Sequence, residues 1–136
     1  MAATIIIVDD EPDLLDLLKL ILTEKTDYQV FTTTDPHEAL RWCREYQGDV
    51  FISDLRMPEL EGIELLKLMQ AQDRTVPFII MTAYGTIESA VEAMRQGAFD
   101  YITKPFRKEQ ILMTIRKALA RRQELQAKTA ASVRKD

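Results

Sequence analysis

The chain has 136 residues, of which 46% are hydrophobic and 29% are charged, so it is long enough and apolar enough for one domain with a sizeable core. Its net charge is −4, so the composition gives no sign of the basic surface that a nucleic-acid-binding domain needs. Cys43 is the only cysteine, which excludes an intrachain disulfide and a zinc site made of cysteines.

The N-terminal half alternates predicted strands with predicted helices. Residues 4–8 are a continuous β-branched run, typical of a strand buried on both faces, and Pro12 then favours a helix start. One face of that helix is predicted to carry Leu14, Leu17, Leu18 and Ile21. A second strand is predicted at residues 28–33. Asp35 as N-cap, with proline at the first helical position and glutamate at the third, predicts a helix start. That helix is expected to stop near Gly48.

The same alternation continues to the last helix. Strands are predicted at residues 49–54, 77–81 and 99–103, and helices with apolar residues at helical spacing follow each of them. Five repeats of strand and helix predict an α/β fold, in which helices cover both faces of a five-stranded parallel sheet. For such a flavodoxin-like three-layer sandwich, the common strand order is 2-1-3-4-5.

Both ends of the chain carry information about organisation. The N-terminus lacks the basic segment and apolar run of a signal peptide, and no run reaches transmembrane length, so a cytoplasmic location without membrane contact is expected. Residues 1–120 are interpreted as the domain. Residues 121–136 contain only Leu125 and Val133 as sizeable aliphatics. They are interpreted as a helical linker, little of which can be buried, toward an output domain that is absent from this chain.

Three carboxylates are predicted to meet at one edge of the sheet. Asp9 and Asp10 follow the first strand, and Asp54 follows the third, and the strand order reverses between these two strands. Crowded like charges raise one another's pKa unless a cation lies among them, and a hard ion such as Mg²⁺ takes oxygen ligands of this kind. The alternative is that Asp9 and Asp10 only cap the first helix.

Asp54 is the candidate nucleophile, because a carboxylate can form an aspartyl phosphate. Thr82 follows the fourth strand and can donate a hydroxyl hydrogen bond to a phosphoryl oxygen, while Lys104 follows the fifth strand and offers a positive charge. Taken singly, Thr82 is more often a strand-end hydroxyl bonded to backbone, and Lys104 more often a solvated lysine. The conjunction of all of them at one sheet edge favours phosphoryl chemistry.

These residues lie in four segments that resemble the receiver domain of bacterial two-component response regulators. The resemblance covers about residues 4–120. The segments are Ile-Val-Asp-Asp-Glu-Pro at 7–12, Ser-Asp-Leu-Arg-Met-Pro at 53–58, Met-Thr-Ala-Tyr-Gly at 81–85 and Gly-Ala-Phe-Asp-Tyr-Ile-Thr-Lys-Pro-Phe at 97–106. Together they are a specific signature, whereas any one of them alone would be weak.

The resemblance implies how the site works. A histidine kinase would pass a phosphoryl group to Asp54, and the chain would catalyse only its own phosphorylation and dephosphorylation. Mg²⁺ would be held by Asp10, Asp54 and the backbone carbonyl of Arg56, with Asp9 acting through water. Thr82 and Tyr101 would couple phosphorylation to the face made by the fourth helix, fifth strand and fifth helix, through which we expect a homodimer. A cis peptide bond before Pro105 is also implied.

Residues 86–101 look most like receivers of the nitrogen-regulator class, which usually precede an ATPase domain and a DNA-binding domain. Control of transcription through such an output domain is therefore expected. One alternative is a Mg²⁺-dependent phosphohydrolase, but Arg56 stands where such enzymes have a second aspartate. Another is a flavin- or nucleotide-binding protein, but no glycine-rich loop follows the first strand. The receiver module of a hybrid kinase and a degenerate interaction module are further alternatives, although the expected site residues are intact.

Overall fold

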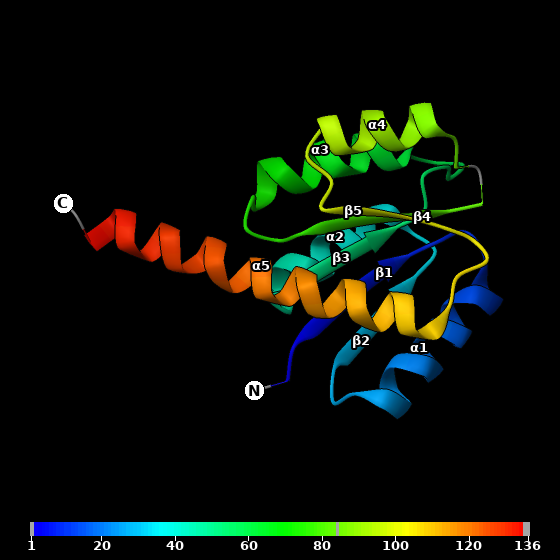
Figure 1. Cartoon of the computed structure of the whole chain (residues 1–136), viewed down its shortest axis with the longest axis horizontal. Coiled ribbons are helices and arrows are strands. Elements are labelled where there is room, and N and C mark those ends of the chain that lie inside the picture. The colour runs from blue at the N-terminus through cyan, green and yellow to red at the C-terminus, as the bar shows by residue number, and fades with distance from the viewer. Residues whose placement is uncertain (1, 84, 135–136) are drawn as a thin grey trace.

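A computed structural model describes residues 2–83 and 85–134, with five parallel strands in one sheet ordered β2-β1-β3-β4-β5 (Figure 1). The strands are β1 (Thr4–Val8), β2 (Gln29–Thr33), β3 (Val50–Ser53), β4 (Phe78–Thr82) and β5 (Asp100–Thr103). The helices are α1 (Pro12–Lys25), α2 (Pro36–Glu45), α3 (Gly62–Gln72), α4 (Ile87–Arg95) and α5 (Lys108–Arg134). The predicted fold class and strand order are confirmed, and the strand ends differ from the prediction by at most one residue.

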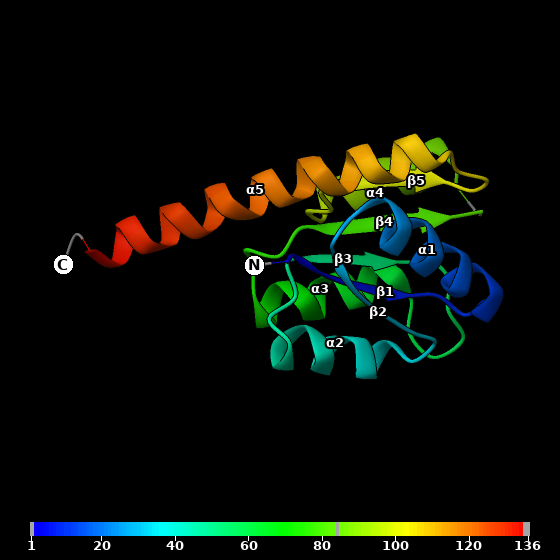
Figure 2. The same ribbon diagram turned by 90° about the horizontal axis from the view of Figure 1, so that it is seen from below.

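Helices cover both faces of the sheet, so the molecule has three layers (Figure 2). Successive strand residues point to opposite faces, and Ile5 and Ile7 pack with α1 and α5 whereas Ile6 and Val8 pack on the side of α2, α3 and α4. β1, β3 and β4 are buried along their whole length, as expected for inner strands of a parallel sheet with two covered faces. The continuous apolar runs in the sequence therefore reflect burial on two sides.

The buried face of α1 differs from the prediction. The residues buried against the sheet are Leu15, Leu18, Ile21 and Leu22. Leu17, which was predicted to share this face, is 46% exposed. Leucine and isoleucine occur almost all the way around this helix, so helical spacing alone fits more than one face, and packing against the sheet decides between them.

The last helix continues well beyond the core (Figures 1 and 2). Ala118 is the last fully buried apolar residue among the side chains described up to residue 129, yet the helix runs on to Arg134. Among residues 120–129 the expectation that little of this extension can be buried is confirmed, and the buried exception is Arg122, which is 7% exposed. Within residues 2–83 and 85–134, no helix has the length and apolar character to cross a membrane. Tyr84 of the 81–85 segment, and residues 135 and 136 of the predicted linker, lie outside the described residues.

Candidate functional site

The parallel register aligns the carboxyl ends of the strands and thereby brings the predicted site residues to one edge. Val8 and Ser53 are paired across β1 and β3, so Asp9 and Asp54 leave the sheet side by side, and the N–H of Asp54 donates to the carbonyl of Val8 at 3.1 Å. At the other side of the site, the N–H of Lys104 donates to the carbonyl of Thr82 at 2.9 Å, which continues the β4–β5 ladder.

Four carboxylates gather at this edge. One carboxylate oxygen from each of Asp9, Asp10, Glu11 and Asp54 lies within 4.8 Å of those of the other three. Asp9 and Asp54 are both 2% exposed, whereas Asp10 and Glu11 face solvent. Glu11 was not among the predicted site residues. Its position directly after the aspartate pair was the available signal, because a residue at the start of the turn into α1 stays next to the strand end.

Lys104 supplies the positive charge inside this cluster. Its Nζ lies 2.7 Å from Oδ2 of Asp9, 3.3 Å from Oδ2 of Asp54 and 3.8 Å from Oε1 of Glu11, and the side chain is 10% exposed. The peptide bond between Lys104 and Pro105 is cis, which confirms the prediction. The ammonium group bridges the two buried carboxylates, so the charges of the site are balanced in part from within the chain.

Burial and the ion pair between Asp9 and Lys104 shift the pKa values of these two groups in opposite directions. Burial raises the pKa of Asp9 from 3.8 to about 6, even though hydrogen bonds from Lys104 and from the N–H of Glu11 lower it. Burial alone lowers the pKa of Lys104, but its hydrogen bond to Asp9 and the charges of Asp9 and Asp54 more than offset this, so its pKa lies above the ordinary 10.5. The lysine thus stays charged, and burying the Asp9 charge remains costly.

The backbone fixes both buried carboxylates. The N–H of Glu11 donates to Oδ1 of Asp9 at 2.9 Å, and the N–H of Arg56 donates to Oδ1 of Asp54 at 3.4 Å. The loop after Asp54 folds back so closely that a Cβ at Gly62 would lie 2.6 Å from the Asp54 carbonyl oxygen. Asp9 and Asp10 do not cap α1 with their side chains: the N-cap residue is Glu11, and no side-chain capping bond is present there.

The two residues that are expected to change conformation on phosphorylation, Thr82 and Tyr101, lie on β4 and β5. Thr82 is the last residue of β4 and is fully buried. Tyr101 on β5 is half-buried, and its hydroxyl lies 2.9 Å from Oγ of Ser89 on α4. Ser89 was not predicted, although its spacing from Thr86 marks a capping box, in which the Thr86 hydroxyl accepts from the Ser89 N–H at 3.0 Å and the Ser89 hydroxyl from the Thr86 N–H at 2.9 Å.

Comparison with known proteins identifies the family. The family model for the response regulator receiver domain matches residues 5–116. The chain belongs to this family. The transcriptional regulatory protein GlrR of Escherichia coli K12 is 42% identical over 117 residues, which are 86% of this chain and 26% of that protein. A receiver domain from Clostridium thermocellum of known structure is 32% identical, with a TM-score of 0.84, covering 90% of this chain and 98% of that one.

The similarity to the nitrogen-regulator class is also confirmed. A solution structure of the beryllofluoride-activated NtrC4 receiver domain dimer is 28% identical to this chain, with a TM-score of 0.82 over 88% of this chain and 98% of that one. This chain spans only 25 to 29% of the length of the curated relatives it matches, in which the receiver is joined to further sequence. Receiver domains are phosphoacceptor switches of two-component systems and bind Mg²⁺ at an acidic pocket, and an acidic cluster of that kind is present here.

Proposed function

We propose that this receiver domain accepts a phosphoryl group from a sensor histidine kinase on Asp54, and that it catalyses only its own phosphorylation and dephosphorylation. The observation that carries the proposal is the buried Asp54 carboxylate, held 3.3 Å from the Lys104 ammonium group in a cluster of four acidic residues. Asp54 is buried, like Asp9, and lies directly after β3, at the edge where open α/β sheets bind their ligands.

The donor set fits Mg²⁺, which prefers carboxylate, carbonyl and water oxygens. We assign the metal to Asp10, Asp54 and the backbone carbonyl of Arg56, with Asp9 acting through water. When bound, Mg²⁺ neutralises negative charge on the carboxylates and on the phosphoryl oxygens. The backbone bonds to Asp9 and Asp54 orient both carboxylates before any ligand arrives.

The transfer itself needs one nucleophile and two hydrogen-bond donors from the chain. An oxygen of Asp54 forms a bond to phosphorus while the bond from phosphorus to the donor imidazole nitrogen breaks, and the electron pair of that bond stays on the nitrogen. Lys104, already in contact with Asp54, donates to a phosphoryl oxygen, and the Thr82 hydroxyl donates to another. The same groups hold the phosphoryl group until water hydrolyses it.

We propose that phosphorylation is communicated to a partner through the surface formed by α4, β5 and α5. This face carries unusually exposed apolar side chains: Ile87 is 85% exposed, Val91 49% and Met94 47% on α4, and Met113 is 51% exposed on α5. Movement of Thr82 toward the phosphoryl group and rearrangement of Tyr101 would change this face and favour a homodimer. The dimer formed by the beryllofluoride-activated NtrC4 receiver domain supports the homodimer part of this proposal. In the full-length regulator, an attached output domain would then control transcription.

Incubation with acetyl phosphate and Mg²⁺, followed by intact mass spectrometry, tests the acceptor. The wild-type chain should gain the mass of one phosphoryl group, Asp54→Asn should gain none, and Asp13→Asn, which changes an exposed aspartate on α1, should behave as wild type. Undiminished phosphorylation of Asp54→Asn would contradict the assignment.

Sedimentation with and without beryllofluoride tests the dimer face. The wild-type chain should shift toward a dimer when beryllofluoride and Mg²⁺ are added. Val91→Ser should weaken that shift, whereas Leu17→Ser, a matched apolar substitution at an exposed position of α1, should leave it intact. Equal dimerisation of both variants would place the interface elsewhere.

A further inference from the structure

The segment after the core carries a buried arginine that the phosphorylation chemistry does not use. Ile111, Ile115 and Ala118 form the buried stripe of α5, and Arg122 occupies the next position of that stripe, one helical turn after Ala118. Its side chain is 9% exposed. A guanidinium group removed from water to this extent needs compensating charges.

The compensating groups come from two loops at the amino-terminal ends of the strands, opposite the phosphorylation site. Nε of Arg122 lies 3.6 Å from Oδ1 of Asp49, directly before β3, and Nη1 lies 3.5 Å from Oδ2 of Asp73, at the end of α3. Nη1 also donates to the hydroxyl of Thr75 in the loop before β4. One side chain of α5 therefore contacts segments that lead into two neighbouring strands.

The acceptor groups are already fixed by the domain itself. Oδ2 of Asp49 accepts from the N–H of Thr4 at 2.8 Å. Oδ1 of Asp73 accepts from the N–H of Thr75 at 2.9 Å and from its hydroxyl at 2.6 Å. These bonds orient the carboxylates independently of Arg122. The domain therefore presents a preformed binding site for the guanidinium group, made of Asp49 and Asp73, which we call the seat.

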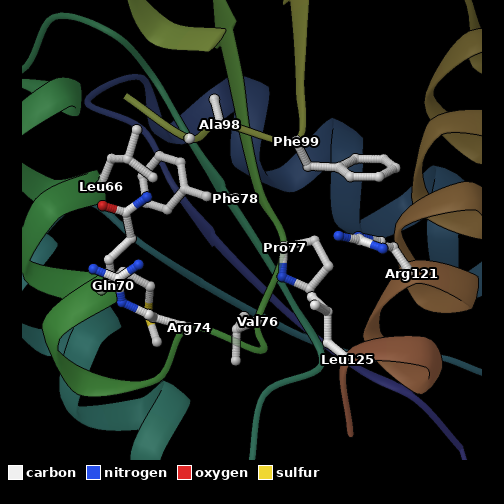
Figure 3. A pocket seen from close by; sticks show the side chains of 12 residues that line it. Leu66, Gln70, Arg74, Val76, Pro77, Phe78, Ala98, Phe99, Arg121 and Leu125 are labelled. Carbon is white, nitrogen blue, oxygen red and sulfur yellow. The ribbon is translucent and has the colours of Figure 1, made fainter. Parts of the chain in front are cut away.

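The neighbouring residues show how specific this contact is. Arg121 is 43% exposed, and its ion pair is with Glu124 of the same helix at 3.1 Å. Leu125, one turn beyond Arg121, is half-buried and lines the groove between α3 and α5 together with Val76 and Pro77 (Figure 3). The extension is therefore held against the domain at least as far as Leu125.

We propose that Arg122, seated on Asp49 and Asp73, clasps the extension of α5 to the receiver body and fixes the direction in which the helix leaves the domain. The segment after residue 120 is then a rigid continuation of the receiver as far as Leu125, for about one and a half turns, rather than a flexible tether. An output domain joined to this helix would inherit its orientation from a contact at the edge of the sheet opposite Asp54.

Hydrogen exchange measured by mass spectrometry on the whole chain tests the clasp. Arg122→Gln should raise exchange of the amides in residues 119–129 by tenfold or more, while the amides of β1 and β3 stay as protected as in the wild type. Arg121→Gln is the matched control, because it makes the same substitution one residue away and leaves the seat intact; it should change exchange by less than twofold. Asp73→Asn should reproduce the Arg122→Gln effect in part.

Cys43 gives a second readout from within the protein. Its thiol is buried, and the residue lines a cavity together with Arg122 and Asp73. Arg122→Gln should speed labelling of this thiol by a water-soluble disulfide reagent about tenfold, and Arg121→Gln should not. Unchanged exchange in 119–129 with unchanged labelling would overturn the proposal, and so would a loss of protection spread over the whole sheet. If Arg122→Gln does not fold, the same two measurements, exchange in residues 119–129 and labelling of Cys43, are made on Asp73→Asn and judged in the same way.

Discussion

Replacing Asp9 by asparagine should stabilise the metal-free domain at neutral pH. The Asp9 side chain is 3% exposed, and burial raises its pKa from 3.8 to about 6. At about 1.4 kcal/mol for each pH unit, this difference means that keeping Asp9 ionised at pH 7 costs the folded state roughly 3 kcal/mol. The hydrogen bond from Lys104 is already part of this balance, because it lowers the pKa of Asp9, and a neutral asparagine removes the cost that remains. The expected gain in the free energy of unfolding at pH 7 is therefore up to about 3 kcal/mol.

The gain should depend on pH in one direction. Because the pKa of Asp9 is higher in the folded state than in the unfolded state, the folded chain binds the proton more tightly. The stability that this proton contributes is fully present below pH 3.8 and is lost as the pH rises through about 6. The free energy of unfolding of Asp9→Asn should therefore exceed that of the wild type most clearly above pH 6, and this difference should shrink toward pH 4.

Urea denaturation in EDTA at several pH values between 4.5 and 7.5 measures this difference. Asp16→Asn, which removes an equal charge from an exposed position on α1, is the control and should show no comparable pH-dependent gain. Adding Mg²⁺ should raise the wild-type midpoint more than that of Asp9→Asn. A variant less stable than the wild type at pH 7.5, or a difference that does not change between pH 4.5 and 7.5, would refute the reasoning.

Three further substitutions test the scaffold, each by its denaturation midpoint. Gly62→Ala should destabilise the domain by about 1 to 3 kcal/mol and slow phosphorylation, because the new Cβ would lie 2.6 Å from the backbone oxygen of Asp54. Asp35→Ala should cost about 1 kcal/mol, since its side chain caps α2 by accepting from the N–H of His37 at 2.9 Å. Phe51→Ala should cost about 3 to 5 kcal/mol, as expected for an aromatic side chain with no exposed surface. A neutral result for any of these would contradict its assigned role.

The sheet and the positions of the site residues were predictable because they follow from short-range patterns joined by one topological rule. Apolar runs mark the buried strands, and parallel pairing brings the carboxyl ends of those strands to one edge. The residues that immediately follow the strands, Asp9, Asp54 and Lys104, therefore meet without any knowledge of side-chain contacts. The residue-level roles of Mg²⁺ ligation and switching rest on the proposals above.

The features that were missed depend on contacts between distant segments. The buried face of α1 is ambiguous in a helix that carries Leu14, Leu15, Leu17 and Leu18, and only the sheet selects among them. Arg122 has the composition of a solvated linker residue, and its partners lie 49 and 73 residues before it in the sequence. No local period encodes such a pairing, since the carboxylates belong to loops whose positions are set by the whole fold.

The length of α5 has a mechanical consequence. The helix has 27 residues and is therefore about 40 Å long, of which roughly 18 Å extends beyond Arg122. Acting as a lever with its pivot at that residue, it would convert a tilt of about 10° into a displacement of roughly 3 Å at its far end. Shifts of about 1 to 2 Å already repack helices at subunit interfaces. A tilt of the core half of α5 on the sheet would thus reach the far end as a displacement large enough to change how that end packs against a partner.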